Sequence, residues 1–397
     1  MASRIASLAT VGLTILVAAC SNPERLPAVP VDGTTEAVVH GMRHIRFWVG
    51  ADASPWIDEG LQATAREEEY LAENGHTGPL PTANFLAISG GGDNGAFGAG
   101  LLVGWSETGT RPQFKTVTGI STGALTAPFA FLGPAYDDEL AAVYTQIAPD
   151  DVYTFRGPFA AIFDDAMADS APLRKLIARY ADEAMLAELA AEYHKGRNLL
   201  IATTNLDARR PVIWNVTAIA ASGHPKALEI FHDILIASAS LPGAFPPVMF
   251  DVEFDGKLYQ EMHVDGGAMA QVFVYPGSLE VAKLSAQLGM ERDRALYIIR
   301  NARLDSEWAS IERQTIDIVS RAVTTLVQTQ GIGDLYRIFL IAKRDHVDFN
   351  LAYIGSDFTE VHEEEFDPVF MRNLFQYGYE EALKGYEWKK FPPGYVE

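Results

Sequence analysis

The sequence predicts an α/β fold built on a mainly parallel central sheet. From Phe85 onward, short apolar runs such as FLAIS, NLLIATTNL and ALYIIRNARL alternate with longer amphipathic stretches, the pattern of strand and helix units on a parallel sheet. Glycine-containing motifs follow two of the expected strands, FLAIS and FKTVT, and an apolar, helix-like stretch follows each motif. The 397 residues are enough to bury a large core of this kind.

The first nineteen residues have the character of an export signal. Arg4 precedes an apolar run that ends at Ala19 and is shorter than the roughly 20 residues that a membrane-spanning helix needs. The run ends in LVAAC, which resembles a bacterial lipobox, and Cys20 is the only cysteine of the chain. The resemblance implies removal of residues 1–19, lipidation of Cys20 and, because Ser21 follows, an exported protein anchored to the outer membrane. The alternative is an ordinary signal peptide that happens to end at a cysteine.

Two segments separate this signal from the main domain. Residues 20–40 are polar and rich in proline, which favours an extended tether. Residues 41–83 are expected to form an N-terminal helical extension. Within it, Ser54 as N-cap and Pro55 as first helical residue predict a helix that ends near Asn74.

The main domain is expected to run over residues 84–390. Its last helix begins at the Asp367-Pro368 signal, where an N-capping aspartate precedes a proline. The apolar residues that recur near helical spacing predict the packed face of this helix, and they are Val369, Leu374, Tyr377 and Leu383.

Composition excludes one class of partner. The chain has 31 Lys+Arg against 52 Asp+Glu, a net charge of −21. Nucleic acid and strongly anionic surfaces are therefore poor electrostatic partners for the chain as a whole.

The first glycine motif, GGGDNG, has two possible uses. Gly90, Gly92 and Gly95 stand as G-x-G-x-x-G between strand and helix, which is how a dinucleotide-binding turn begins, but the same backbone could cradle an oxyanion. A dinucleotide site needs an acidic residue roughly 20 residues further on. At that place the chain has Thr118, so the dinucleotide interpretation lacks its distinguishing residue.

The second motif, GISTG, predicts a nucleophile. Gly119 and Gly123 flank Ser121 in a G-x-S-x-G between strand and helix, the pattern of a nucleophile elbow. A serine nucleophile needs a base, and two candidates lie close together. His263 is two positions before Asp265 in a predicted strand, so alternation places both side chains on one face.

Three motifs in order, GGGDNG, GISTG and VDGG, resemble the patatin-like phospholipase family, and SASLPGAFPPV resembles the stretch that precedes the family's aspartate. The resemblance implies a three-layer α/β/α architecture and a Ser121–Asp265 dyad with no cofactor and no metal. The two glycines of the DGG turn are Gly266 and Gly267. The resemblance also implies an oxyanion hole at the glycine loop, formed by Gly90, Gly91, Gly92, Asn94 and Gly95. Asn94 departs from the family pattern, which has Arg or Lys at that position.

The expected function is that of a lipid acyl hydrolase of the phospholipase A type. The resemblance implies cleavage of carboxylic ester bonds of glycerophospholipids through an acyl-enzyme, with membrane lipid as both substrate and anchor surface. Two alternatives remain: an esterase or thioesterase acting on small soluble substrates, and a non-catalytic lipoprotein that uses the fold as a binding module.

Overall fold

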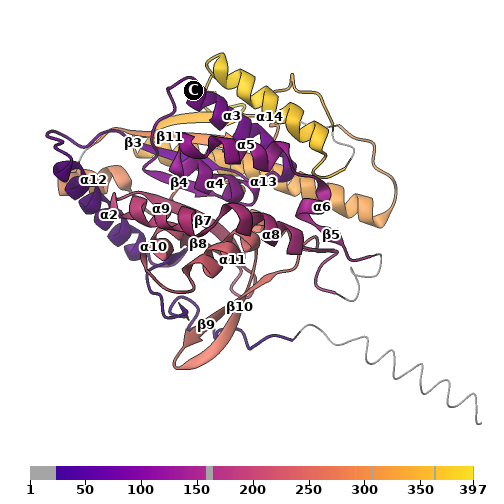
Figure 1. Cartoon of the computed structure of the whole chain (residues 1–397), viewed down its shortest axis with the longest axis horizontal. Coiled ribbons are helices and arrows are strands. Elements are labelled where there is room, and N and C mark those ends of the chain that lie inside the picture. The colour runs from indigo at the N-terminus through magenta and orange to yellow at the C-terminus, as the bar shows by residue number, and fades with distance from the viewer. Residues whose placement is uncertain (1–23, 158–163, 291, 306–307, 362–363, 397) are drawn as a thin grey trace, which may run out of the picture.

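The computed structural model describes residues 24–157, 164–290, 292–305, 308–361 and 364–396 (Figure 1). The predicted signal at residues 1–19, together with Cys20 and Ser21, lies outside this described part. Within it, one ten-stranded sheet has the order β1-β9-β10-β7-β4-β3-β11-β12, and β8 and β2 extend from the other edge of β7. The strands are β1 (Val38–Val39), β2 (Arg46–Trp48), β3 (Ala83–Ile88), β4 (Thr116–Gly119), β7 (Asn198–Asn205), β8 (Arg210–Asn215), β9 (Val248–Phe254), β10 (Lys257–Asp265), β11 (Arg294–Arg300) and β12 (Asp348–Tyr353).

The middle of this sheet is parallel. Strands β7, β4, β3, β11 and β12 pair in parallel, whereas β8, β2, β10, β9 and β1 join antiparallel. All eight residues of β7 are buried, as expected for a strand covered on both faces. A short separate hairpin pairs β5 (Thr154–Phe155) with β6 (Ala168–Asp169).

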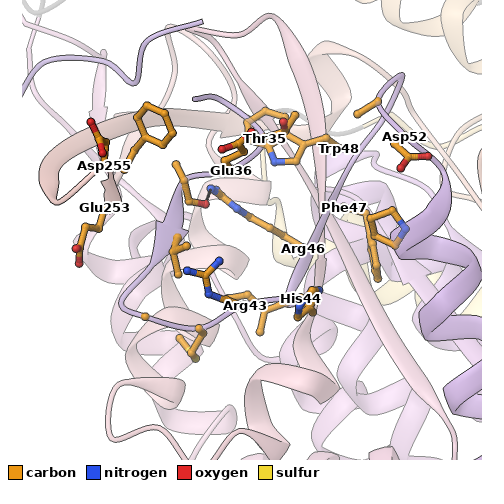
Figure 2. Close-up of a pocket in the computed structure, with 18 of the residues that line it drawn as sticks. Thr35, Glu36, Arg43, His44, Arg46, Phe47, Trp48, Asp52, Glu253 and Asp255 are labelled. Carbon is orange, nitrogen blue, oxygen red and sulfur yellow. Dashed lines mark hydrogen bonds between the residues drawn. The ribbon is translucent and has the colours of Figure 1, made fainter. Parts of the chain in front are cut away.

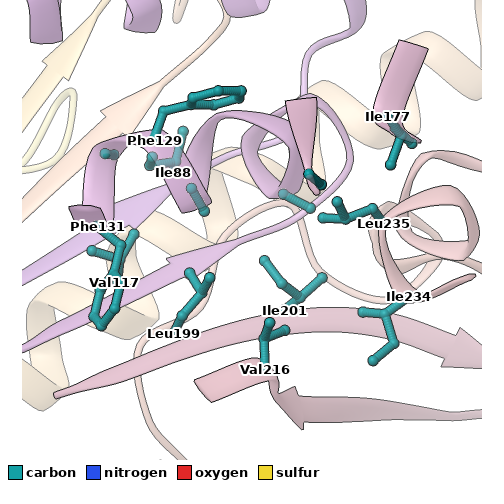
Figure 3. Close-up of a cluster of buried hydrophobic side chains, with 14 of the residues drawn as sticks. Ile88, Val117, Phe129, Phe131, Ile177, Leu199, Ile201, Val216, Ile234 and Leu235 are labelled. Atoms are coloured by element: carbon teal, nitrogen blue, oxygen red, sulfur yellow. The ribbon is translucent and has the colours of Figure 1, made fainter. Parts of the chain in front are cut away.

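Helices cover both faces of the sheet. Side chains on one face of the strands, including Ile88, Val117 and Ile201, pack under most of the helices (Figure 3). These helices are α3 (Gly95–Glu107), α4 (Thr122–Leu132), α5 (Asp137–Thr145), α6 (Pro149–Val152), α8 (Ala171–Tyr180), α9 (Glu183–His194), α10 (Val216–Ala221), α11 (Ala227–Ala239) and α14 (Pro368–Leu383). Alternate residues such as Ala87 and Leu200 face the other layer, where α2 (Ser54–Glu73) and α13 (Thr315–Arg344) lie; α12 (Val281–Leu288) is a short helix with no buried side chain. The expected three-layer α/β/α class is confirmed.

Residues before the main domain contribute to the sheet. The sequence predicts a tether over residues 20–40, yet Val39 is buried in β1 and Arg25 forms an ion pair with Asp207 at 2.7 Å. In the predicted helical extension, β2 pairs with β8 before α2 begins. Strand pairing with distant residues leaves no local sequence signal, which is why the sequence predicts neither strand.

The two predicted terminal helices are present. Helix α2 has Pro55 in its first turn as predicted, but Ala53 is the N-cap residue and the Asp52 carboxylate accepts from the N–H of Ser54 at 3.1 Å. Helix α14 starts after Asp367, whose side chain caps it as the sequence predicts.

The packed face of α14 differs from the prediction. Val369 and Leu383 are exposed, and the buried residues are Phe370, Met371, Leu374, Phe375, Gly378 and Ala382. Backbone crosses backbone at this contact: a Cβ at Gly100 of α3 would lie 1.9 Å from the Phe375 carbonyl oxygen. Glycines therefore decide the orientation of α14, and apolar spacing alone misses it. Among the described residues, no helix is long and apolar enough to cross a bilayer.

Candidate active site

Ser121 occupies a strained turn between β4 and α4. Its backbone lies at φ 56° and ψ −127°, a conformation that costs a non-glycine residue of order 1–3 kcal/mol. The flanking glycines allow the turn, because a Cβ at Gly119 would lie 2.5 Å from the Gly123 carbonyl oxygen, and one at Gly123 only 2.3 Å from that of Ile88. The half-buried Ser121 side chain is thereby presented at the carboxyl end of the parallel strands, as the elbow motif predicts.

Asp265 reaches the same place from the opposite direction. Strand β4 pairs with residues 198–201 of β7, and antiparallel β10 pairs with residues 203–205 along the same edge. The two strands therefore end against each other on either side of Ala202. This brings the Ser121 hydroxyl into position to donate a hydrogen bond to the Asp265 carboxylate.

The Asp265 carboxyl is buried and shielded from solvent. The residue is 3% exposed, and its Oδ1 accepts from the N–H of Gly267 at 2.6 Å. Burial raises the pKa of Asp265 to about 6, against the opposing effect of the hydrogen bonds from Ser121 and Gly267. A carboxylate with this pKa is a stronger base than an ordinary aspartate and is still ionised at neutral pH. Gly266 is needed because a Cβ there would lie 2.7 Å from the Ala202 carbonyl oxygen.

The C-terminal end of α11 and the residue that caps it fix both residues of the pair. Ser238 Oγ accepts from the N–H of Ser121 at 3.0 Å and donates to the Ala202 carbonyl at 2.7 Å. The carbonyl of Ser240 accepts from the N–H of Asp265 at 2.9 Å. These serines belong to the SASLPG stretch, which the sequence analysis noted only for its family resemblance.

The glycine loop lies beside Ser121. A Cβ at Gly90 would lie 3.1 Å from the Ser121 Cβ, so the two segments touch. The N–H groups of Gly91 and Gly92 make no hydrogen bond to another described residue and are available to an oxyanion. Gly91 cannot carry a side chain, because its Cβ would lie 2.1 Å from the Asn301 carbonyl oxygen.

Other residues of the predicted oxyanion hole have different partners. The N–H of Gly90 donates to the Gln271 carbonyl at 3.1 Å, and the N–H of Asn94 donates to the Gly91 carbonyl at 3.1 Å. Gly95 begins α3, where a Cβ would lie 2.2 Å from Thr122 Oγ1. Gly90, Asn94 and Gly95 therefore shape the loop, while Gly91 and Gly92 present its free donors.

Gln271 and Arg300 support the loop and carry no sequence signal. Gln271 Nε2 donates to the Gly267 carbonyl at 2.8 Å, and the Gln271 carbonyl accepts from Gly90, so this residue ties the DGG turn to the glycine loop. Arg300 ends β11 and contacts the loop from behind. Both lie outside the three motifs. Gln271 follows the VDGG motif by four residues, whereas only the sheet topology brings Arg300 to the site.

His263 belongs to a separate buried cluster. Its Nδ1 lies 2.8 Å from Thr203 Oγ1 and its Nε2 lies 3.0 Å from Glu261 Oε2. Glu261 in turn pairs with Arg46 of β2 at 2.7 Å. Burial lowers the pKa of His263, which favours the neutral imidazole. Both ring nitrogens are engaged away from Ser121, so Asp265 is the better placed of the two candidate bases.

Two further features bear on ligand chemistry. The described residues contain no group of three or more His, Cys, Asp or Glu placed to hold a metal ion. A cavity of about 960 Å³ lies between residues 35–56 and the turn at residues 253–256 (Figure 2). That turn lies at the start of β10, and Asp265 is the last residue of β10. The length of β10 therefore separates this cavity from the Ser121–Asp265 pair.

The fold and the site together define an α/β protein in which a serine on a strand-to-helix turn faces a buried carboxylate and a glycine loop. Residues 86–276 match the family model described as patatin-like phospholipase. Residues 86–276 therefore form a patatin-like phospholipase domain, the class of domain found in lipid acyl hydrolases. A search among curated proteins found no match.

Solved structures similar to this chain include two bacterial proteins. VipD from Legionella pneumophila is 13% identical with a TM-score of 0.32, and the match covers 77% of this chain and 66% of VipD. ExoU from the type III secretion system of Pseudomonas aeruginosa, solved in complex with SpcU, is 14% identical with a TM-score of 0.30, and the match covers 77% of this chain and 52% of ExoU. The chain thus spans less than two thirds of the length of these structures.

Proposed function

We propose that this chain is a phospholipase A-type lipid acyl hydrolase in which Ser121 and Asp265 form a catalytic dyad. The observation that carries the proposal is the pairing of a serine on a strained elbow with a buried carboxylate whose pKa is raised to about 6. Burial and fixed geometry are what an aspartate needs to serve as a base for a serine hydroxyl.

The reaction follows from these groups. Ser121 Oγ attacks the ester carbonyl carbon while Asp265 accepts the hydroxyl proton, and the N–H groups of Gly91 and Gly92 stabilise the resulting oxyanion. Collapse of the tetrahedral intermediate breaks the ester C–O bond, and the leaving alcohol takes the proton from Asp265. Water then attacks the acyl-enzyme with Asp265 again as base, which releases the fatty acid and restores Ser121.

Exposed apolar side chains near the dyad support a lipid substrate over a small soluble ester. Leu241 directly follows Ser240, which holds Asp265, and is 49% exposed. On α13, the exposed residues Val319, Val323 and Leu326 lie in one row with Gln330, whose side chain accepts from Gln271 at the site. A contiguous apolar row beside a catalytic pair suits the hydrocarbon region of a lipid aggregate.

Labelling with a fluorophosphonate tests the dyad. We expect the purified full chain to form an adduct that mass spectrometry locates on Ser121, and the adduct to be lost in Asp265→Ala. Absence of labelling on folded protein would contradict the proposal and favour the binding-module alternative. Turnover of short soluble esters without any gain on lipid vesicles would instead favour the esterase alternative.

We also propose that the protein is exported and anchored through a lipid on Cys20, which would keep the enzyme at its substrate without a basic surface. The support is the LVAAC sequence before a solitary cysteine. Incorporation of labelled palmitate by the wild-type chain in bacteria, and its loss together with membrane association in Cys20→Ala, tests this. Equal membrane association of the two chains would contradict it.

A further inference from the structure

A buried guanidinium lies directly behind the glycine loop. Arg300 is 3% exposed, and its Nη1 donates to Gly90 O at 3.3 Å and to Ser89 Oγ at 3.2 Å. Ser89 Oγ itself donates to Gly90 O at 2.7 Å. The carbonyl of Gly90 therefore accepts two hydrogen bonds, one of them from a charged donor.

The geometry of the peptide bond links the contact at the Gly90 oxygen to the direction of the Gly91 N–H. The described chain has no cis peptide, so the Gly91 N–H points away from the Gly90 oxygen with which it shares a peptide plane. Donors that hold the oxygen therefore fix the direction of the N–H. They also polarise the amide, because hydrogen bonds in a chain strengthen one another, and the Gly91 N–H becomes a stronger donor.

The charge of Arg300 is little compensated. Within the described residues its guanidinium forms no ion pair, and its charge interaction is with Asp334, whose own ion-pair partner is Arg337 at 3.1 Å. Burial lowers the pKa of Arg300 to about 10, which still leaves it charged at neutral pH. The side chain also fits tightly, because a Cβ at Gly331 of α13 would lie 2.7 Å from Arg300 Nη2.

The loop sequence GGGDNG has no cation of its own. We propose that Arg300 is a positioning residue for the glycine loop. Its guanidinium holds the Gly90 carbonyl and thereby orients and polarises the Gly91 N–H toward the oxyanion. The inference rests on the proposed function, because it concerns the oxyanion of that reaction. Because Arg300 is buried behind the loop and acts through it, we expect its effect to fall on the transition state, with little effect on ground-state binding.

Steady-state kinetics on a short soluble ester test the role of Arg300. In Arg300→Met we expect kcat to fall about 10- to 100-fold while KM stays within threefold, since only oxyanion stabilisation is weakened. Arg300→Lys keeps the charge and should recover part of the loss. The pH at which activity rises should stay the same in both variants, because Asp265 is not affected.

Arg197→Met provides the matched control. Arg197 is also buried and donates to the backbone carbonyls of Phe114 and Phe131; it differs in pairing with Glu192, and it lies just before β7, away from the site. We expect this variant to lose stability while kcat of the folded protein is unchanged. Equal kcat in the folded Arg300→Met and Arg197→Met proteins would overturn the proposal.

Ser89→Ala is a second test of the proposal, to be used if Arg300→Met does not fold. It removes the other donor to Gly90 O, so we expect kcat to fall about 3- to 10-fold at constant KM, and an unchanged kcat would overturn the proposal. Failure of the proposed function looks different: the wild-type chain would then not be labelled on Ser121, and Ser121→Ala would not change its hydrolysis. A labelled, active wild type with unaffected Arg300→Met and Ser89→Ala contradicts the role of Arg300 alone.

Discussion

Ser121 and Asp265 meet because the strands that carry them end against the same edge of β7. Gly119 of β4 pairs with Ile201, and Asp265 of β10 pairs with Thr203, so one residue of β7 separates the two strand ends. The relative position of Ser121 and Asp265 is thus set by the hydrogen-bond register of the sheet. A rigid pair of this kind suits a reaction that needs the base within hydrogen-bond reach of the hydroxyl.

The dyad should behave as a unit. Ser121→Ala and Asp265→Ala are each expected to lower kcat/KM by at least about 10³-fold, and the double variant should be scarcely worse, because removing either partner disables the same step. Ester hydrolysis by the three variants, with circular dichroism to verify folding, checks this. Multiplicative losses in the double variant would mean that the two residues act independently.

Activity should rise with pH through the pKa of Asp265. The base must be ionised to accept the proton, so kcat/KM is expected to rise with a midpoint near pH 6 and to level off above about pH 7. A pH–rate profile on a soluble ester measures this directly. A midpoint near 4 would show that the carboxylate is more hydrated than its burial indicates.

Stability should depend on pH in the opposite sense. The pKa of Asp265 rises from 3.8 to about 6 on folding, so its favourable contribution is complete below pH 3.8 and is lost as pH rises through 6. Asp265→Asn lacks this titration. Relative to wild type, it should gain up to about 3 kcal/mol of unfolding free energy between pH 4 and pH 7. Urea unfolding at the two pH values measures the difference, and a constant difference would contradict the expectation.

The elbow should not tolerate a methyl group at Gly123. Its Cβ would overlap the Ile88 carbonyl oxygen, so Gly123→Ala is expected to cost at least about 3 kcal/mol and to abolish activity. Gly60→Ala is the matched control, because Gly60 lies in exposed α2 with no atom near the added Cβ, and it should gain about 0.5–1 kcal/mol. Thermal unfolding of both variants measures the two changes in stability. Equal changes in the two variants would mean that the turn adapts to the added methyl group.

His263 should matter for stability and little for chemistry. His263→Ala removes one buried partner from Glu261, which keeps Arg46, and one from Thr203, which keeps Trp214, so we expect a loss of about 1–3 kcal/mol of unfolding free energy. The folded variant, assayed at low temperature, should keep kcat within a few fold of wild type. A loss comparable to that of Asp265→Ala would instead make His263 the base.

The apolar row on α13 should matter only at a lipid surface. Val323→Ser with Leu326→Ser is expected to lower hydrolysis of phospholipid vesicles about 10-fold and to leave a soluble short-chain ester unaffected. Leu340→Ser is the control, because Leu340 is equally exposed on the other half of the same helix. Equal vesicle activity in the two proteins would remove the support that this row gives to a lipid substrate.

The sequence by itself determined the α/β class, the strand-to-helix turn at Ser121 and, to within one residue, the starts of α2 and α14. These features depend on local rules: glycines at Gly119 and Gly123 permit a strained turn, and Asp367 before a proline starts a helix. The order of the three motifs added the resemblance to patatin-like phospholipases, which implied that Ser121 and Asp265 act together.

Only the tertiary structure decided what lies around these motifs. Strands β1 and β2, the face of α14, the contacts of Ser238 and Ser240 at the end of α11 and the contact of Arg300 with Gly90 all involve residues far apart in the chain. Their partners are chosen by strand register and close backbone packing, and neither leaves a periodic or compositional trace in one sequence. The physical reason is that a local motif specifies a local conformation, whereas burial, charge and donor direction depend on everything packed against it.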